Sequence, residues 1–195
     1  MMLLFLCIFV VKGLSQTKLK GYVFSLFNKG FVEIETEENN GFFNSFYILL
    51  FLFSIITISF TAYYFKTRMF LAEHGFANFL NIFYTLFIYF SLKWILEYLL
   101  SVLFLIKNQV RFFLISKSCY LISVSFFLFF GIILSQYSNI SSTFLFYFAG
   151  FLFAIRFVLH LTYNKNLIFN QLFYFILYIC AFEIAPLFLL FKLLF

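Results

Sequence analysis

The sequence predicts an all-α fold, a polytopic bundle of transmembrane helices built as one domain over residues 1–195, and three observations support it. Of the 195 residues, 65% are hydrophobic and 10% are charged, whereas soluble globular domains carry about a quarter charged residues. A soluble chain of this length exposes much of its surface to water, and this composition has too little polar surface for that. Long apolar runs recur along the chain. We therefore predict that lipid covers much of the surface.

The apolar runs have the length of membrane spans. A helix needs about 20 apolar residues to cross the hydrocarbon core, and five segments satisfy this: 42–64, 79–106, 112–134, 143–163 and 167–191. The opening segment 1–11, MMLLFLCIFVV, has about half that length, so it is either an interfacial anchor or a short sixth span. No basic residue precedes it and no A-x-A site follows it, so we do not expect a signal peptide.

Residues 12–41 form the one long polar stretch, which we expect to be a cytoplasmic or interfacial connector. Its first part is basic and its second part is acidic, with apolar residues interspersed: Lys12, Lys18, Lys20 and Lys29, then Glu33, Glu35, Glu37 and Glu38, with Tyr22, Val23, Phe24, Leu26, Phe27 and Phe31. Two interpretations stay open, a helix lying on the membrane surface and a solvated connector.

The distribution of basic residues predicts the orientation, because lysine and arginine accumulate on the cytoplasmic side. If the connector is cytoplasmic, that side holds eight basic residues and the other side holds three. The eight are Lys12, Lys18, Lys20, Lys29, Lys107, Arg111, Lys117 and Lys165, and the three are Lys66, Arg68 and Lys192. This places the C-terminus outside the cytoplasm. In this setting the net charge of +6 orients the chain, and we do not expect nucleic acid binding.

Four charged residues fall inside predicted spans and predict an intramembrane polar cluster, since buried charges in membranes face the bundle interior and find partners. They are Lys93, Glu97, Arg156 and Glu183, with His160 at the edge. Lys93 and Glu97 share a helix face, as do Arg156 and His160. The same face as Lys93 carries a polar stripe: Asn81, Thr85, Tyr89 and Ser101. A weaker polar face in the first full span holds Ser54, Thr57 and Thr61.

Pro186, the single proline, follows Glu183 by three residues. It lacks an N–H group, so we expect a kink that leaves a backbone carbonyl to be satisfied by neighbours. Three roles for the cluster stay open: fixing helix packing, conducting a proton or an ion, and catalysis. No sequence motif predicts a cofactor or a metal, and the chain has no aspartate. Cys7, Cys119 and Cys180 lack a pairing or ligand spacing and are predicted to be small buried side chains.

Several segments resemble an uncharacterised family of small multi-pass inner-membrane proteins of Bacteroidetes. They are the connector KGLSQTKLKGYVFSLFNKGF, the span NSFYILLFLFSIITISF, the Lys93 region and the ending FYFILYICAFEIAPLFLLFK. The resemblance implies a bacterial inner-membrane location with a periplasmic C-terminus, and it implies no activity.

We therefore expect a non-enzymatic membrane subunit or assembly partner, in contact with the lipid bilayer and with another membrane protein or a larger complex. The first alternative is a proton- or ion-coupled transporter or conducting subunit. The second is an enzyme that acts on a lipid-borne substrate. A dry, fully paired cluster favours the subunit, whereas a wet cavity that reaches Glu183 favours transport or catalysis.

Overall fold

The computed structural model describes residues 2–37, 45–69, 75–103, 107–138 and 142–163, and these form seven α-helices without a strand among them. The helices are α1 (Met2–Leu14), α2 (Gln16–Val23), α3 (Lys29–Glu37), α4 (Ser45–Met69), α5 (Phe76–Leu103), α6 (Lys107–Tyr137) and α7 (Ser142–Tyr163). The all-α prediction is confirmed for the described residues.

Three helices are long and apolar enough to cross a membrane. Their apolar stretches are Ser45–Thr67 in α4, Phe76–Leu96 in α5 and Leu114–Tyr137 in α6, which correspond to the predicted spans 42–64, 79–106 and 112–134. Leu4–Leu14 and Thr143–Leu159 are shorter apolar helices, and the predicted span 167–191 lies outside the described residues. The structure thus supports three spans, and the bundle of five stays a prediction.

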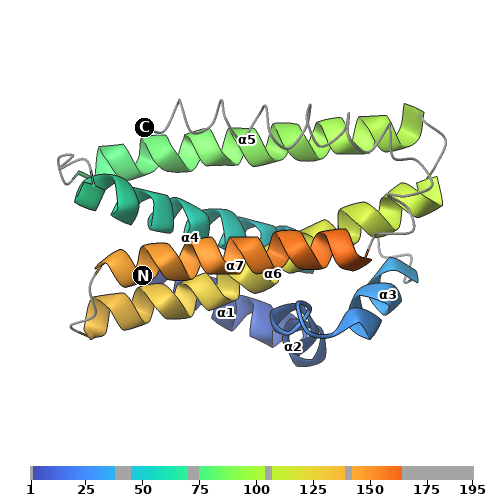
Figure 1. The fold of residues 1–195 in the computed structure, drawn as a ribbon, viewed down its shortest axis with the longest axis horizontal. Coiled ribbons are helices and arrows are strands. Elements are labelled where there is room, and N and C mark those ends of the chain that lie inside the picture. Colours follow the sequence, from blue (N-terminus) through green and yellow to red (C-terminus); the bar gives the residue numbers. More distant parts are fainter. Residues whose placement is uncertain (1, 38–44, 70–74, 104–106, 139–141, 164–195) are drawn as a thin grey trace.

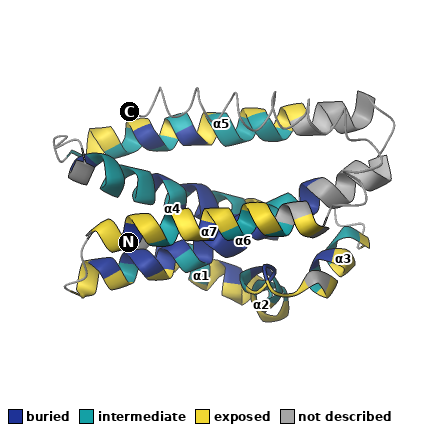
Figure 2. Cartoon of the chain, in the orientation of Figure 1, coloured by how far each residue is buried: buried dark blue, intermediate teal, exposed yellow. Residues whose placement is uncertain are grey.

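The helices lie in layers, with α5 on one side, α4 next to it, then α6 with α7, and α1 to α3 on the opposite side (Figure 1). Helix α6 packs against α7, α4, α2 and α3, so it is the centre of the fold. Figure 2 shows the same order in burial: buried residues dominate α6, while α5 and α7 present exposed faces. In the apolar stretch of α6, 72% is buried, against 11% in α5.

Small side chains explain why α6 accepts so many neighbours. Ser116, Cys119 and Ser123 are fully buried and lie on one helix face, because residues three and four positions apart are neighbours on a helix. Small residues let helix backbones approach closely in membranes, where packing rather than the hydrophobic effect drives association. The short helices α2 and α3 pack against α6, and Cys119 and Ser123 contact the end of α2 and the turn after it.

The predicted polar face of α4 is satisfied within its own helix. Ser54 and Thr57 are buried, and together with Thr61 they donate hydrogen bonds to the carbonyl oxygen four residues earlier, at 2.7–2.9 Å. Because these hydroxyl groups need no partner from another helix, α4 can pack against α6 through its apolar side chains.

The contact between α2 and α3 depends on a glycine. A Cβ atom added at Gly21 would overlap three atoms of the Phe31 ring, whereas a Cβ atom at Gly13 in α1 meets nothing within 4 Å. Overpacking costs about 1–3 kcal/mol, more than the about 1 kcal/mol that alanine gains over glycine in a helix. We expect Gly21→Ala to lower, and Gly13→Ala to keep or raise, the midpoint of SDS-induced unfolding. Equal midpoints would contradict this packing.

Candidate functional site

Two hydrogen bonds fasten α2 and the following turn to α6. The Ser25 hydroxyl donates to the carbonyl oxygen of Cys119 at 2.9 Å, and the Ser123 hydroxyl donates to the carbonyl oxygen of Val23 at 2.6 Å. Val23 is the last residue of α2, and the last carbonyls of a helix have no donor inside it. Ser123 therefore supplies a hydrogen bond that the end of α2 lacks, and the Cys119 carbonyl, inside α6, accepts the hydrogen bond of the buried Ser25 hydroxyl.

Charged residues continue this contact. Lys18 Nζ lies 4.0 Å from Glu35 Oε2, and the Glu35 side chain is 15% exposed. Glu35 is also hydrogen-bonded to the Tyr22 side chain. The carboxylate of α3 thus holds two residues of α2. We call the group of Lys18, Tyr22, Ser25, Glu35, Cys119 and Ser123 the polar junction.

Tyr22 is the buried centre of the polar junction. Its side chain is 1% exposed, and its ring packs edge-on against Phe31 at 5.2 Å and against Phe46 of α4 at 5.8 Å. Burial raises the pKa of the Tyr22 hydroxyl well above its usual range, and the Cys119 thiol and the Glu35 carboxylate nearby raise it further. The hydroxyl therefore stays protonated and acts as a donor.

This raised pKa predicts a loss of stability in alkali. The unfolded tyrosine ionises near its ordinary pKa of 10.0, while the folded one keeps its proton, so unfolding releases a proton above that pH. The free energy of unfolding then falls by about 1.4 kcal/mol per pH unit. We expect Tyr22→Phe to remove this part of the slope, measured by SDS titration between pH 8 and 11. The exposed Tyr137→Phe is the control and should follow the parent.

The structure shows one contact for each of Lys93 and Arg156, two members of the predicted cluster. Lys93 Nζ lies 5.8 Å from the centre of the Tyr89 ring on the same helix, α5. Arg156 Nη2 of α7 donates to the carbonyl oxygen of Lys117 in α6 at 3.3 Å. Arginine thus bridges α7 to α6, which is a helix-packing contact.

The remaining predicted site residues are described in part. In the polar stripe, Asn81 is exposed, and the Thr85 hydroxyl donates to the Asn81 carbonyl oxygen at 2.8 Å. The side chains of Glu97, Ser101 and His160, and the whole of Glu183 and Pro186, lie outside the described residues. The complete cluster, the kink and the full stripe therefore stay predictions.

The polar junction brings together residues that the sequence analysis assigned to different classes. The sequence analysis treated Lys18 and Glu35 only as charges of the connector. It predicted Cys119 to be a small buried side chain, and the structure confirms that Cys119 is fully buried. One signal for docking was present, since Leu19, Tyr22 and Leu26 follow a helical spacing of three and four. Within the described residues no three side chains of His, Cys, Asp or Glu are grouped to hold a metal ion. The interactions that the described residues make at this site are hydrogen bonds between helices.

A comparison with known families places most of the chain in a family. The family model described as Domain of unknown function (DUF4271) matches residues 1–194. Searches among curated proteins and among solved structures gave no match. The match supports the uncharacterised family inferred from the sequence, while the bacterial group and the inner-membrane location stay predictions.

Proposed function

The chain belongs to the DUF4271 family, and from this premise we propose that it is a multi-pass membrane protein acting as a non-enzymatic subunit or assembly partner. Its place would be a bacterial inner membrane, with a periplasmic C-terminus. The described polar groups support this, because Ser25, Ser123 and Arg156 are used to join helices to one another.

The observation that carries the proposal is the outer face of α7. Gly150 and Ala154 are exposed and four residues apart, and nothing lies within 4 Å of a Cβ atom added at Gly150. Pairs of small residues at this spacing let a second membrane helix approach closely. We propose that a helix of another membrane protein packs on this face.

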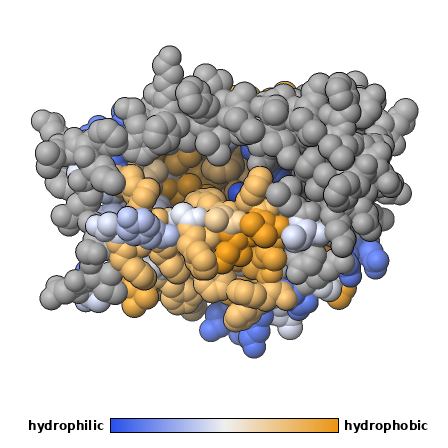
Figure 3. Space-filling view, in the orientation of Figure 1, coloured by the Kyte–Doolittle hydropathy of each residue, from blue (hydrophilic) through white to orange (hydrophobic). Residues whose placement is uncertain are grey.

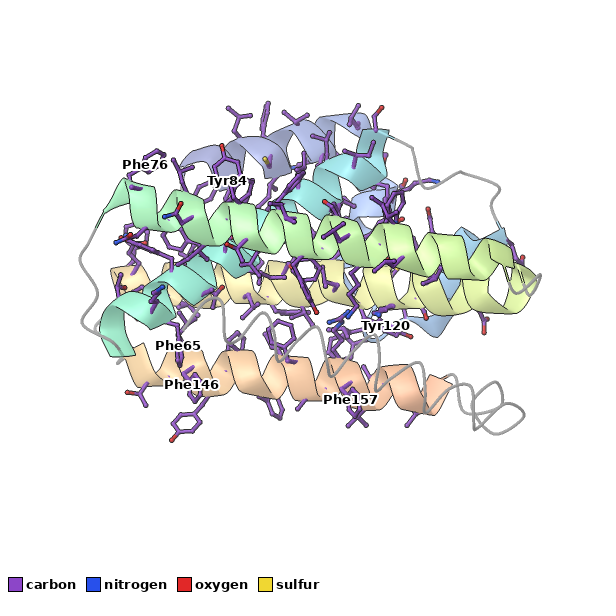
Figure 4. The ribbon with its side chains drawn as sticks, turned by 90° about the horizontal axis from the view of Figure 1, so that it is seen from above. Phe65, Phe76, Tyr84, Tyr120, Phe146 and Phe157 are labelled. Atoms are coloured by element: carbon purple, nitrogen blue, oxygen red, sulfur yellow. The ribbon has the colours of Figure 1, made fainter. Side chains whose placement is uncertain are left out.

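Aromatic side chains flank the two small residues on α7. The exposed ones are Phe144, Phe146, Tyr147, Phe151, Phe153 and Phe157. Aromatic residues are enriched at protein interfaces because they bury a large area at a small cost in conformational entropy. Phe146 also packs against Phe65 of α4, with ring centres 4.5 Å apart, and Figure 4 shows these two rings facing each other between the helices. Leu145 and Leu152 on the opposite side of α7 are buried, and this packed side holds the outer side in place for a partner.

Native purification in mild detergent, followed by mass spectrometry, tests the proposal. We expect a stoichiometric membrane protein to co-purify, and Gly150→Leu to lose most of it because leucine fills the open approach. Gly13→Leu is the matched control, since a Cβ atom at Gly13 also meets nothing within 4 Å, and it should keep the partner. A stable single chain, or a homodimer, would overturn the proposal of a foreign partner and turn attention to transport assays.

A further inference from the structure

Lys93 and Arg156 lie at one level of the bundle, although they belong to different helices. The hydrogen bond from Arg156 to the Lys117 carbonyl oxygen sets α7 beside α6 at this level. Helices α5 and α6 are separated in the sequence by residues 104–106 and run in opposite directions (Figure 1). Lys93 comes ten residues before the end of α5, and Lys117 comes ten residues after the start of α6. Each therefore lies about 15 Å from the shared end of the two helices.

Both cations face the interior of the bundle. Lys93 comes seven residues after Leu86, and residues at this spacing share one face of a helix. Leu86 is buried and belongs to a cluster with Ile55 of α4. Arg156 faces α6, because its guanidinium donates to the Lys117 carbonyl oxygen. Charged side chains within apolar membrane helices usually pair with an opposite charge, so we expect a carboxylate at this level.

Helix α4 begins close to this level and does not accompany α5 and α6 to their shared end. Its first residue is Ser45, and the Phe46 ring packs against Tyr22 of the polar junction. The polar junction is fastened to α6 at Cys119, two residues after Lys117. From this level to the shared end, α4 therefore supplies no neighbour to α5.

Exposed apolar side chains lie beside the two cations. Leu96, three residues after Lys93, is 46% exposed, and Phe153, three residues before Arg156, is 38% exposed. The described surface drawn in Figure 3 is mostly apolar. An apolar helix can pack on such a surface, and a carboxylate on that helix would meet the cations.

The C-terminal segment 167–191 can supply this helix. It is a predicted span that follows the end of α7 after residues 164–166, and a connection this short makes two helices antiparallel neighbours. The connection spans at most about 13 Å, and Glu183 lies about 24 Å along the segment if it is helical. Glu183 thus lies between about 11 and 24 Å back from the end of α7, and Arg156 lies about 10 Å back from it. A connection that runs on past α7 therefore brings the two residues level.

The positions of the acidic residues favour the same segment. All seven are glutamates, and five of them lie outside the predicted spans: Glu33, Glu35, Glu37, Glu38 and Glu73. Glu97 follows Lys93 by about one helical turn on α5, so Glu183 is the acidic residue that another segment can bring to this level. The Arg156 guanidinium has five N–H groups. It can therefore donate to the Lys117 carbonyl oxygen and bind a carboxylate at the same time.

We propose that the C-terminal segment packs antiparallel to α7 on the side that faces α5, and that the Glu183 carboxylate pairs with the Arg156 guanidinium at the level of Lys93. Arg156 then joins α6, α7 and the C-terminal segment. Gly150 and Ala154, which would receive a foreign helix, lie about 120° and 160° around α7 from Arg156. The segment and a partner can therefore bind together, and this inference does not depend on the proposed function.

Disulfide crosslinking in membranes tests the placement of the segment. The background has alanine in place of Cys7, Cys119 and Cys180. Phe153→Cys then introduces a thiol three residues before Arg156, and Leu187→Cys introduces one four residues after Glu183. In antiparallel helices with Arg156 beside Glu183, these two positions come to nearly the same level. We expect oxidation to form a disulfide within one chain, and the absence of this disulfide overturns the proposal.

Tyr147→Cys combined with Leu187→Cys is the control pair. Tyr147 is exposed, but it lies nine residues before Arg156 and on the opposite side of α7. We expect this pair to stay reduced under the same oxidation. A disulfide in the control pair and none in the first pair would place the segment elsewhere on α7 and overturn the proposal.

Stability measurements test the ion pair. We expect Arg156→Gln and Glu183→Gln each to lower the midpoint of SDS-induced unfolding, because each leaves a charge without its opposite. The double variant should lose no more than either single variant. Glu37→Gln is the matched control, since Glu37 is exposed on α3, and its effect should simply add to that of Arg156→Gln. Losses that add in the Arg156 and Glu183 double variant overturn the pairing, while co-purification of a partner is unaffected by either result.

Discussion

Val32→Asp should release α3 from α6 and expose the Cys119 thiol. Val32 is 0% exposed and lies in α3, which packs against α6. A carboxylate buried there, with no residue positioned to pair with it, costs several kcal/mol. Detaching α3 from α6 is the smallest movement that returns the carboxylate to water. In a Cys7→Ala, Cys180→Ala background, we expect the rate of maleimide labelling at Cys119 to rise. The rise is about tenfold for each 1.4 kcal/mol by which the substitution lowers the free energy needed to detach α3 from α6.

Ile34→Asp is the matched control for this prediction. Ile34 lies two residues further along α3 and is 58% exposed, so the same new charge stays accessible to water there. Surface substitutions of this kind stay within about 0.5 kcal/mol, and labelling of Cys119 should remain close to the parent rate. If both variants label equally fast, the charge of α3 rather than the burial of Val32 governs docking, and the described packing is wrong.

Phe53→Ala should weaken the contact between α4 and α6 more than any exposed substitution. Phe53 is 1% exposed, and its ring centre lies 4.7 Å from that of Phe126 and 5.8 Å from that of Phe129, both on α6. Removing a buried ring costs about 3–5 kcal/mol. We expect about 3 kcal/mol, because detergent or lipid also surrounds apolar rings in the unfolded state. The measurement is the free energy of unfolding from an SDS titration.

Phe130→Ala is the control variant, which distinguishes the loss of packing contacts from the loss of an aromatic ring. Phe130 directly follows Phe129 on α6 but is 57% exposed, so fewer contacts within the protein are lost. We expect a loss below about 1 kcal/mol. A loss as large as that of Phe53→Ala would show that aromatic content, and not the contact between α4 and α6, sets the stability.

The helical class and three membrane-length helices are local properties, and the sequence alone determined them. A helix over a continuous apolar run depends only on residues that are close together in the sequence. The predicted spans 42–64, 79–106 and 112–134 therefore correspond to α4, α5 and α6 in the structure. Their bounds differ, since α4 continues to Met69 and α6 begins at Lys107. Helical hydrogen bonds continue past the point where the apolar run stops.

Only the tertiary structure decided how the polar residues of α6 are used. Ser123 and Ser125 are both fully buried serines of one apolar helix, and their local sequence gives them the same options. Ser125 donates to the Leu121 carbonyl in its own helix, whereas Ser123 donates to Val23, 100 residues earlier in the chain. The difference follows from which face of α6 meets α2, and that depends on the packing of the whole bundle. The polar junction therefore became visible only in the folded chain, because its members are distant in sequence and meet through that packing.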